Sequence, residues 1–339
     1  MGPMIQLYSS FIRRKEMNTV LGCLVTDSVG PGEYAVKFSK AARETLRVEA
    51  VAAMRSPYLA LCIGLRRLGL KAGSLVAISP LAPLYHKLAT EDAGFEPAYY
   101  DYDSETCEFD FSGMTGKNLA AMVLYEPFGL LPEKSAILSM GLPIIEDMSQ
   151  SLGASRDGVW AGSIGNLALY GLEQGAIVTA GGGALLAASS RRDAPIVKEL
   201  SETMPREIAL TDYNAALGLA QLKDLPDALE RRGSLDSSFK RELAKTRHRA
   251  ILQKGEGQGG LSVFPVLIES GMRDVVVYAR KNGIEAAPAF EQSLVSMEDF
   301  PQICPGAHAL ALRCAIFPLH EKIGTKDARL IEKVLATLP

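Results

Sequence analysis

The sequence has few of the residues that build covalent or metal cross-links. Its 339 residues include five cysteines and four histidines. The cysteines are odd in number and show neither a C-x-x-C pair nor a His/Cys cluster with zinc spacing; they are Cys23, Cys62, Cys107, Cys304 and Cys314. This pattern argues against a disulfide framework and a structural zinc site, so we predict no metal and a reducing compartment.

An excess of one charge and long apolar runs are also missing. The 36 Lys and Arg residues nearly balance the 39 Asp and Glu residues, for a net charge of -3, which argues against binding to nucleic acid or to an anionic membrane. Arg13, Arg14 and Lys15 interrupt the N-terminal apolar residues before a signal-peptide core can form. No later stretch approaches the roughly 20 apolar residues of a spanning helix. We therefore expect a cytoplasmic protein whose partners are small molecules or proteins.

The sequence does contain ample material for a hydrophobic core. With 47% hydrophobic residues it is globular, and its length fits one large domain plus a smaller one, or two similar ones. From about residue 56 to residue 190, short apolar runs alternate with helical patterns, which predicts an α/β domain with a mainly parallel sheet. Ser56 followed by Pro57 is typical of a helix start. The predicted strands are 75–78, 121–124, 143–145, 167–170 and 184–188.

The C-terminal part of the chain predicts a smaller unit. Helical patterns cover 213–222, 225–245, 272–282 and 326–338, and an apolar run at 261–268 predicts a strand. We expect Gly233 to interrupt the second of these helices. These patterns assign residues 1–228 to an N-terminal segment with the large domain and 229–339 to a small α+β domain.

Several short motifs follow one another along the chain. The longest is IEDMSQSLGA at 145–154; the others are GLKAG at 69–73, GFEPAYYDYD at 94–103, GSIG at 162–165, NAALGLAQL at 214–222 and FPLH at 317–320. In order and spacing the chain resembles the DegT/StrS-type sugar aminotransferases. These are pyridoxal-phosphate enzymes of fold type I that transaminate keto sugars attached to nucleotides. The resemblance extends over most of the chain and implies the fold-type I aminotransferase fold.

The resemblance implies a cofactor site made of three residues. Asp147 would hold the ring nitrogen of pyridoxal phosphate, Gln150 would lie near the ring, and Tyr58 would stand at the phosphate-binding start of a helix. Without the resemblance, we would interpret Asp147 as a cap of the following turn and Gln150 as a polar loop residue. Glu146 is not expected to pair with Asp147, because successive strand residues point to opposite faces. The resemblance also implies a homodimer with a shared active site.

The Schiff-base lysine of the family is missing from the matching segment. Its place falls at 174–176 (QGA), and the sequence between Lys134 and Lys198 contains no lysine. A related branch of the family uses a histidine there and carries out a dehydration. The four histidines are all outside this segment; they are His86, His248, His308 and His320. We therefore predict no catalytic residue.

Other positions of the family's cofactor site also differ. Gly171 and Gly181 replace a serine and a glutamate, and Glu207 falls where a neighbouring subunit's asparagine would approach the phosphate. The ring that stacks on the cofactor falls at Pro83, although a shift in register would bring Tyr85 or His86 to that place. A helix start of Ser56, Pro57 and Tyr58 replaces the family's S-G-T, so one N–H is lost to proline.

These losses lead to a hypothesis of altered function. The leading interpretation is a pseudoenzyme that keeps the fold and the dimer, lacks lysine-dependent transamination, and binds a nucleotide sugar or a protein partner. The alternative is an active aminotransferase of keto-sugar nucleotides in polysaccharide or amino-sugar biosynthesis. It would recruit a lysine from elsewhere, for which Lys87 and Lys117 are the candidates, or bind the aminated cofactor non-covalently. A third interpretation is a purely structural role.

Overall fold

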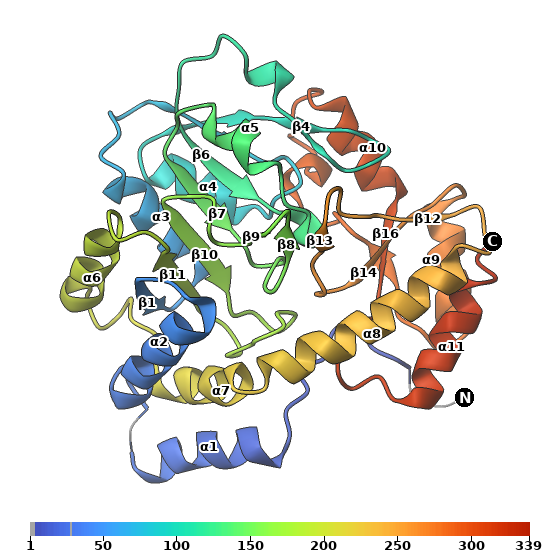
Figure 1. The fold of residues 1–339 in the computed structure, drawn as a ribbon, viewed down its shortest axis with the longest axis horizontal. Helices are drawn as coiled ribbons and strands as arrows, with labels where there is room; N and C mark the ends of the chain where they lie inside the picture. Colours follow the sequence, from blue (N-terminus) through green and yellow to red (C-terminus); the bar gives the residue numbers. More distant parts are fainter. Residues whose placement is uncertain (1–3, 28) are drawn as a thin grey trace.

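The computed structural model describes residues 4–27 and 29–339. A seven-stranded sheet forms the centre of the large domain, in the order β1-β11-β10-β7-β6-β2-β3 (Figure 1). Its strands are β1 (Ala50–Met54), β2 (Leu75–Ile78), β3 (Glu96–Tyr99), β6 (Leu119–Tyr125), β7 (Ile144–Asp147), β10 (Leu167–Gly171) and β11 (Ala184–Ala188). The α/β fold class predicted from the sequence is confirmed.

Most neighbouring strands of this sheet are parallel. Strand β11 is the exception, because it runs antiparallel to both β1 and β10. Strands β1, β7, β10 and β11 are buried along their whole length, as expected for a sheet with both faces covered. The covering helices are α2 (Glu33–Leu46), α3 (Pro57–Arg67), α4 (Tyr85–Asp92), α5 (Lys134–Leu138), α6 (Ala194–Thr203) and α7 (Asp212–Leu222). Helix α1 (Arg14–Val25) packs beneath α7 (Figure 1).

The first residues of α3 explain the Ser-Pro pair in the sequence. Ser56 is the N-cap, and its Oγ accepts a hydrogen bond from the Leu59 N–H at 3.2 Å. Pro57 occupies the first helical position, where a missing N–H costs nothing. The helix start predicted at this place is confirmed.

Helix α8 (Leu225–Leu243) connects the two domains (Figure 1). The expected interruption at Gly233 was wrong, because the helix continues through it. A Cβ at this glycine would lie 3.3 Å from Gln258 Nε2. The glycine therefore marks a close approach of a loop to the helix rather than a helix end.

The small domain is built on an antiparallel sheet in the order β12-β14-β16-β15. Its elements are β12 (Arg249–Ala250), β14 (Phe264–Leu267), α9 (Met272–Lys281), β15 (Ala287–Pro288), α10 (Pro305–Arg313), β16 (Cys314–Phe317) and α11 (Thr325–Leu335). Short pairings β4 (Asp101–Tyr102) with β5 (Phe109–Asp110), and β13 (Gly257–Gln258) with β8 (Ser155–Arg156) and β9 (Val159–Trp160), complete the strands. Within the described residues, no helix combines the length and apolar character needed to cross a membrane.

The N-terminal segment is attached to the small domain. Ile5 forms a parallel bridge with Ile284: its N–H donates to the Gly283 carbonyl, and its own carbonyl accepts from the Glu285 N–H, both at 2.9 Å. His320 Nε2 lies 3.0 Å from the Gln6 carbonyl oxygen. The chain thus crosses from the small domain to the large one immediately before α1.

Candidate functional site

A cavity of about 260 Å³ lies at the carboxyl ends of the central parallel strands, where ligands bind in open α/β sheets. Among the described residues, its lining contains no lysine, arginine or histidine. The lining residues are Tyr8, Pro57, Pro83, Tyr85, Tyr125, Ser149, Gln150, Gly171, Glu173, Gly175, Ala176, Ser262 and Val263. We call this space the strand-end cavity.

Asp147 ends β7 and lies, fully buried, directly behind this lining. Its Oδ1 accepts hydrogen bonds from the Ser149 N–H at 3.0 Å and from the Ser149 hydroxyl. Its Oδ2 accepts from the Tyr85 hydroxyl and lies 2.7 Å from His86 Nε2. A carboxylate has about four lone-pair positions, so the protein itself fills the acceptor capacity of Asp147.

The charge state of this group follows from its partners. Burial acts to raise the pKa of Asp147, but the hydrogen bond and charge of His86, together with the hydrogen bonds from Ser149 and Tyr85, outweigh it, and the pKa lies below its ordinary value. Burial first, and the Asp147 charge second, hold the pKa of Tyr85 well above its usual range. At neutral pH the site therefore contains a buried carboxylate against a neutral phenol.

The other two predicted cofactor residues take different positions. Gln150 lines the cavity, and its Oε1 accepts the Phe128 N–H at 2.8 Å. The hydroxyl of Tyr58 donates to Asp92, and Tyr58 is not part of the lining. The assignment of Asp147, Gln150 and Tyr58 to a cofactor stays a prediction.

The place of the family's lysine is occupied by backbone and by the N-terminal segment. Gly175 and Ala176 line the cavity, and a Cβ on Gly175 would lie 2.9 Å from a ring carbon of Tyr8. Ser10 Oγ donates to the Gln174 carbonyl at 3.4 Å. The two candidate replacement lysines lie elsewhere: Lys87 Nζ is 3.8 Å from Asp299 Oδ2, Lys117 is exposed, and neither lines the cavity.

Glu146 occupies the opposite face of β7, as expected for neighbouring strand residues. Its carboxylate accepts backbone N–H groups from Gly162, Ile164 and Gly165 at 2.9–3.1 Å. The GSIG motif is therefore a loop that wraps a buried carboxylate. Burial and the charge of Glu146 hold the pKa of the neighbouring Glu126 well above its ordinary value.

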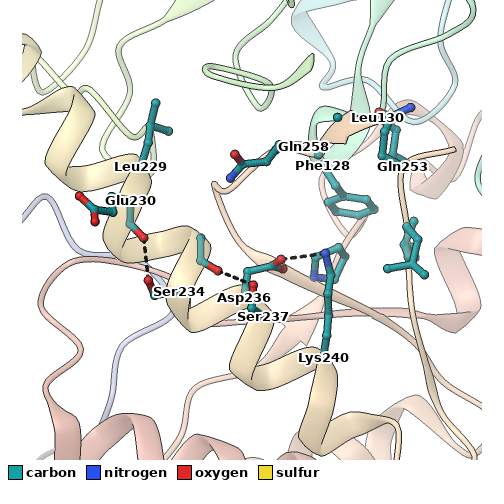
Figure 2. A pocket seen from close by; sticks show the side chains of 17 residues that line it. Phe128, Leu130, Leu229, Glu230, Ser234, Asp236, Ser237, Lys240, Gln253 and Gln258 are labelled. Carbon is teal, nitrogen blue, oxygen red and sulfur yellow. Dashed lines mark hydrogen bonds and ion pairs between the residues drawn. The ribbon is translucent and has the colours of Figure 1, made fainter. Parts of the chain in front are cut away.

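A second and larger cavity, of about 700 Å³, runs along α8. Figure 2 shows that Lys240 in this cavity faces Asp236, and their side chains form an ion pair at 2.7 Å. Phe128, Gln253 and Gln258 approach from the other side of the cavity. Neither Asp147 nor Ser149 belongs to this lining, so Lys240 is not positioned at the strand-end cavity.

Sequence reasoning missed three residues of the site. Tyr8 and Tyr125 line the cavity, and no local motif marks them. Ser149 binds Asp147 and lies within the motif at 145–154, but the motif alone gave it no role. For Tyr85 and His86 a signal existed, because they begin a helix just after a buried strand. They were considered only as ring-stacking groups, whereas the structure shows both bound to Asp147.

The fold and the position of the site define a protein of the fold-type I aminotransferase class. Residues 11–335 match the DegT/DnrJ/EryC1/StrS aminotransferase family, and the chain belongs to that family. A GDP-perosamine synthase of Caulobacter vibrioides is 23% identical over 99% of this chain and 98% of its own length.

Solved structures show the same fold. The aminotransferase TlmJ of Streptoalloteichus hindustanus superposes with a TM-score of 0.88 at 18% identity, covering 98% of each chain. The Escherichia coli GDP-4-keto-6-deoxy-D-mannose-3-dehydratase with bound hydrated pyridoxal phosphate gives a TM-score of 0.87 at 15% identity, covering 98% of this chain and all of that one. The family is pyridoxal-phosphate-dependent, and the dehydratase structure contains that cofactor.

The strand-end cavity does not fit a lysine-bound pyridoxal phosphate. Its described lining offers no amine for an imine and no cation for a phosphate, and it includes the carboxylate of Glu173. In the first turn of α3, Pro57 has no N–H and the Leu59 N–H is bonded to Ser56. The acceptor capacity of Asp147 is filled by three residues of the chain itself.

Proposed function

We propose that this member of the aminotransferase family does not perform lysine-dependent transamination and instead binds a small molecule in the strand-end cavity. One observation carries the proposal: among the residues that the structure describes, none that lines the cavity beside Asp147 carries a side-chain amine. A Schiff base requires a lysine within reach of the aldehyde carbon. At about 260 Å³, the cavity is smaller than the roughly 300–1,000 Å³ typical of drug-sized ligands.

Borohydride trapping tests this proposal. The protein is incubated with equimolar pyridoxal phosphate, reduced, digested and mapped by mass spectrometry. We expect no stoichiometric adduct on any lysine, and the same low scatter of surface labelling in Asp147→Asn. A single lysine labelled to completion, with labelling lost in Asp147→Asn, would contradict the proposal.

A second candidate is non-covalent amino transfer through the aminated cofactor. It is favoured by the ionised state of Asp147, because a carboxylate is the partner that a protonated ring nitrogen requires. The name of the Caulobacter relative also indicates chemistry on a GDP-sugar. Amino-group transfer to a keto-sugar nucleotide that is abolished by Asp147→Ala would establish this function.

We also propose a homodimer and a cytoplasmic location, and nucleotide-sugar binding as part of the second candidate, because the strand-end cavity alone is too small for a nucleotide sugar. The dimer is supported by Met17, Leu21 and Leu24, which lie one helical turn apart on α1 and are each about half exposed. We also propose the domain division between residues 228 and 229. Sedimentation equilibrium tests the dimer, and a monomer at micromolar concentration would exclude it. Titration with a GDP-sugar tests nucleotide-sugar binding.

A further inference from the structure

The electrostatic character of the strand-end cavity is negative. Glu173 is exposed at its edge and forms no ion pair among the described residues. Asp147 lies behind Tyr85 and Ser149, which both line the cavity. Its charge is offset by His86, whose Nε2 is 2.7 Å from Oδ2, so Glu173 is the carboxylate that sets the charge of the cavity. With no cationic side chain in the described lining, an anionic ligand would meet repulsion and a cation would meet attraction.

Three tyrosine rings surround this negative space. Tyr8 comes from the N-terminal segment, Tyr85 from the start of α4, and Tyr125 from the end of β6. Burial raises the pKa of all three phenols, so they are neutral at physiological pH. The face of a tyrosine ring attracts a cation within about 6 Å of its centre. A small organic ammonium ion fits this arrangement of rings and carboxylates.

The exposed ring of this set is held by its neighbours. The Leu7 N–H donates to Glu285 Oε2 at 2.8 Å, and Gln221 Nε2 donates to the Ser10 carbonyl at 2.6 Å. These bonds fix the chain on both sides of Tyr8. The backbone that carries the ring is therefore held before a ligand arrives, which lowers the entropic cost of binding.

Ser262 supplies an independent sign of a ligand. It lines the cavity, is 8% exposed, and its Oγ has no hydrogen-bond partner within the described residues. A buried hydroxyl without a partner is uncommon in folded proteins. A polar group on a bound molecule would satisfy it.

We propose that the strand-end cavity binds a small organic ammonium ion, with Tyr8, Tyr85 and Tyr125 around the cation and Glu173 at its edge. This inference rests on the proposed function, since it requires that no lysine-bound cofactor fills the cavity. Such a site would prefer a cation, whereas a phosphate site prefers an anion. Choline is a suitable probe because a neutral molecule of nearly the same shape exists, 3,3-dimethylbutan-1-ol.

Calorimetric titration of the full chain tests the proposal. We expect choline to bind, the neutral analogue to bind at least about ten-fold more weakly, and inorganic phosphate not to bind. Affinity for choline should fall as salt increases. Equal affinity for choline and its neutral analogue would overturn the proposal, as would the absence of choline binding at millimolar concentration.

Variants at the edge of the cavity assign the effect to named groups. Tyr8→Ala should weaken choline binding about 2- to 30-fold, whereas Tyr8→Phe keeps the ring and should bind within about two-fold of wild type. Glu173→Gln should weaken binding about 2- to 10-fold. Glu202→Gln, an equal charge change on the exposed surface of α6, should not. Equal effects of Glu173→Gln and Glu202→Gln would contradict the assignment.

Failure of this inference can be told apart from failure of the proposed function. If borohydride trapping gives a stoichiometric adduct on one lysine, the proposed function fails first. If no adduct forms and choline does not bind, the proposed function stands and the ammonium site is overturned.

Discussion

At the scale of single residues, two neighbours on β7 have opposite surroundings. Asp147 receives side-chain donors from Tyr85, His86 and Ser149 and is ionised. Glu146 receives three backbone N–H groups, and burial raises its pKa. Both carboxyl groups are fully buried, and burial acts to raise the pKa of each. The side-chain donors around Asp147 more than offset this increase, whereas the backbone N–H groups around Glu146 offset only part of it.

The pair of Glu126 and Glu146 predicts a pH dependence of stability. Burial and the Glu146 charge raise the pKa of Glu126 in the folded state well above its value of 4.5. The folded state then binds more protons than the unfolded state, so this group's contribution to stability declines as pH rises above about 4.5. We expect Glu126→Gln, which mimics the protonated acid, to remove this decline.

Urea unfolding from pH 5 to pH 9 measures the effect. The free energy of unfolding of wild type, minus that of Glu126→Gln, should decrease as pH rises. Glu133→Gln changes an exposed carboxylate and should leave the wild-type profile unchanged. A difference between wild type and Glu126→Gln that is constant with pH would show that Glu126 does not titrate in this way.

The sequence predicted part of the site at this scale. The place of Asp147 at a strand end and the opposite orientation of Glu146 follow from the period of a strand, which needs only local sequence. The meeting of Tyr8, Tyr85 and Tyr125 was not predictable, because long-range folding brings together residues that are far apart in the chain. Tyr58 bonds to Asp92 for the same reason, since its helix packs against α4.

At the scale of elements, two glycines inside helices serve different purposes. Gly218 of α7 lets the helix approach α2, because a Cβ there would lie 2.7 Å from Cζ of the fully buried Phe38. A Cβ at Gly233 of α8 would lie 3.3 Å from the end of the Gln258 side chain, which is exposed and can move, and 3.9 Å from Leu261 Cδ1, which is an ordinary contact distance. The sequence patterns gave the helices their bounds within a few residues but did not distinguish these two contacts.

The two glycines predict opposite effects of alanine. Gly218→Ala should destabilise the protein by about 1–3 kcal/mol, because overpacking against Phe38 exceeds the gain in helix propensity. Gly233→Ala should stabilise it by about 0.5–1 kcal/mol. Thermal and urea unfolding of both variants measure this. Equal effects of the two substitutions would show that the α2–α7 contact relaxes without cost.

At the scale of the whole molecule, Arg232 ties helix α8 to the segments that precede β14 and follow β16. It is 2% exposed, forms two hydrogen bonds with the carboxylate of Glu321 at 2.7 and 3.0 Å, and donates to the carbonyl groups of Leu261, Ser262 and Leu319. Ser262 is also a wall of the strand-end cavity. The position of that wall therefore depends on an arginine in the interdomain helix.

Removal of one member of this pair should be costly. We expect Arg232→Ala to reduce the free energy of unfolding by about 3–5 kcal/mol, because it leaves the Glu321 charge buried without its partner. Arg231→Ala removes a single hydrogen bond to the Ile323 carbonyl and should cost about 1 kcal/mol. Equal losses in the two variants, measured by urea unfolding, would contradict a special role for Arg232.

The attachment of the N-terminal segment has a consequence for any shortened form of the chain. Residues 5–10 bind the small domain at Gly283 and Glu285 and deliver Tyr8 to the large one. A polypeptide that began after residue 10 would keep every strand of the central sheet yet lose one side of the cavity. In such a truncated protein the cavity would be open on the side that Tyr8 covers, and a ligand screen carried out on it would test a different binding site.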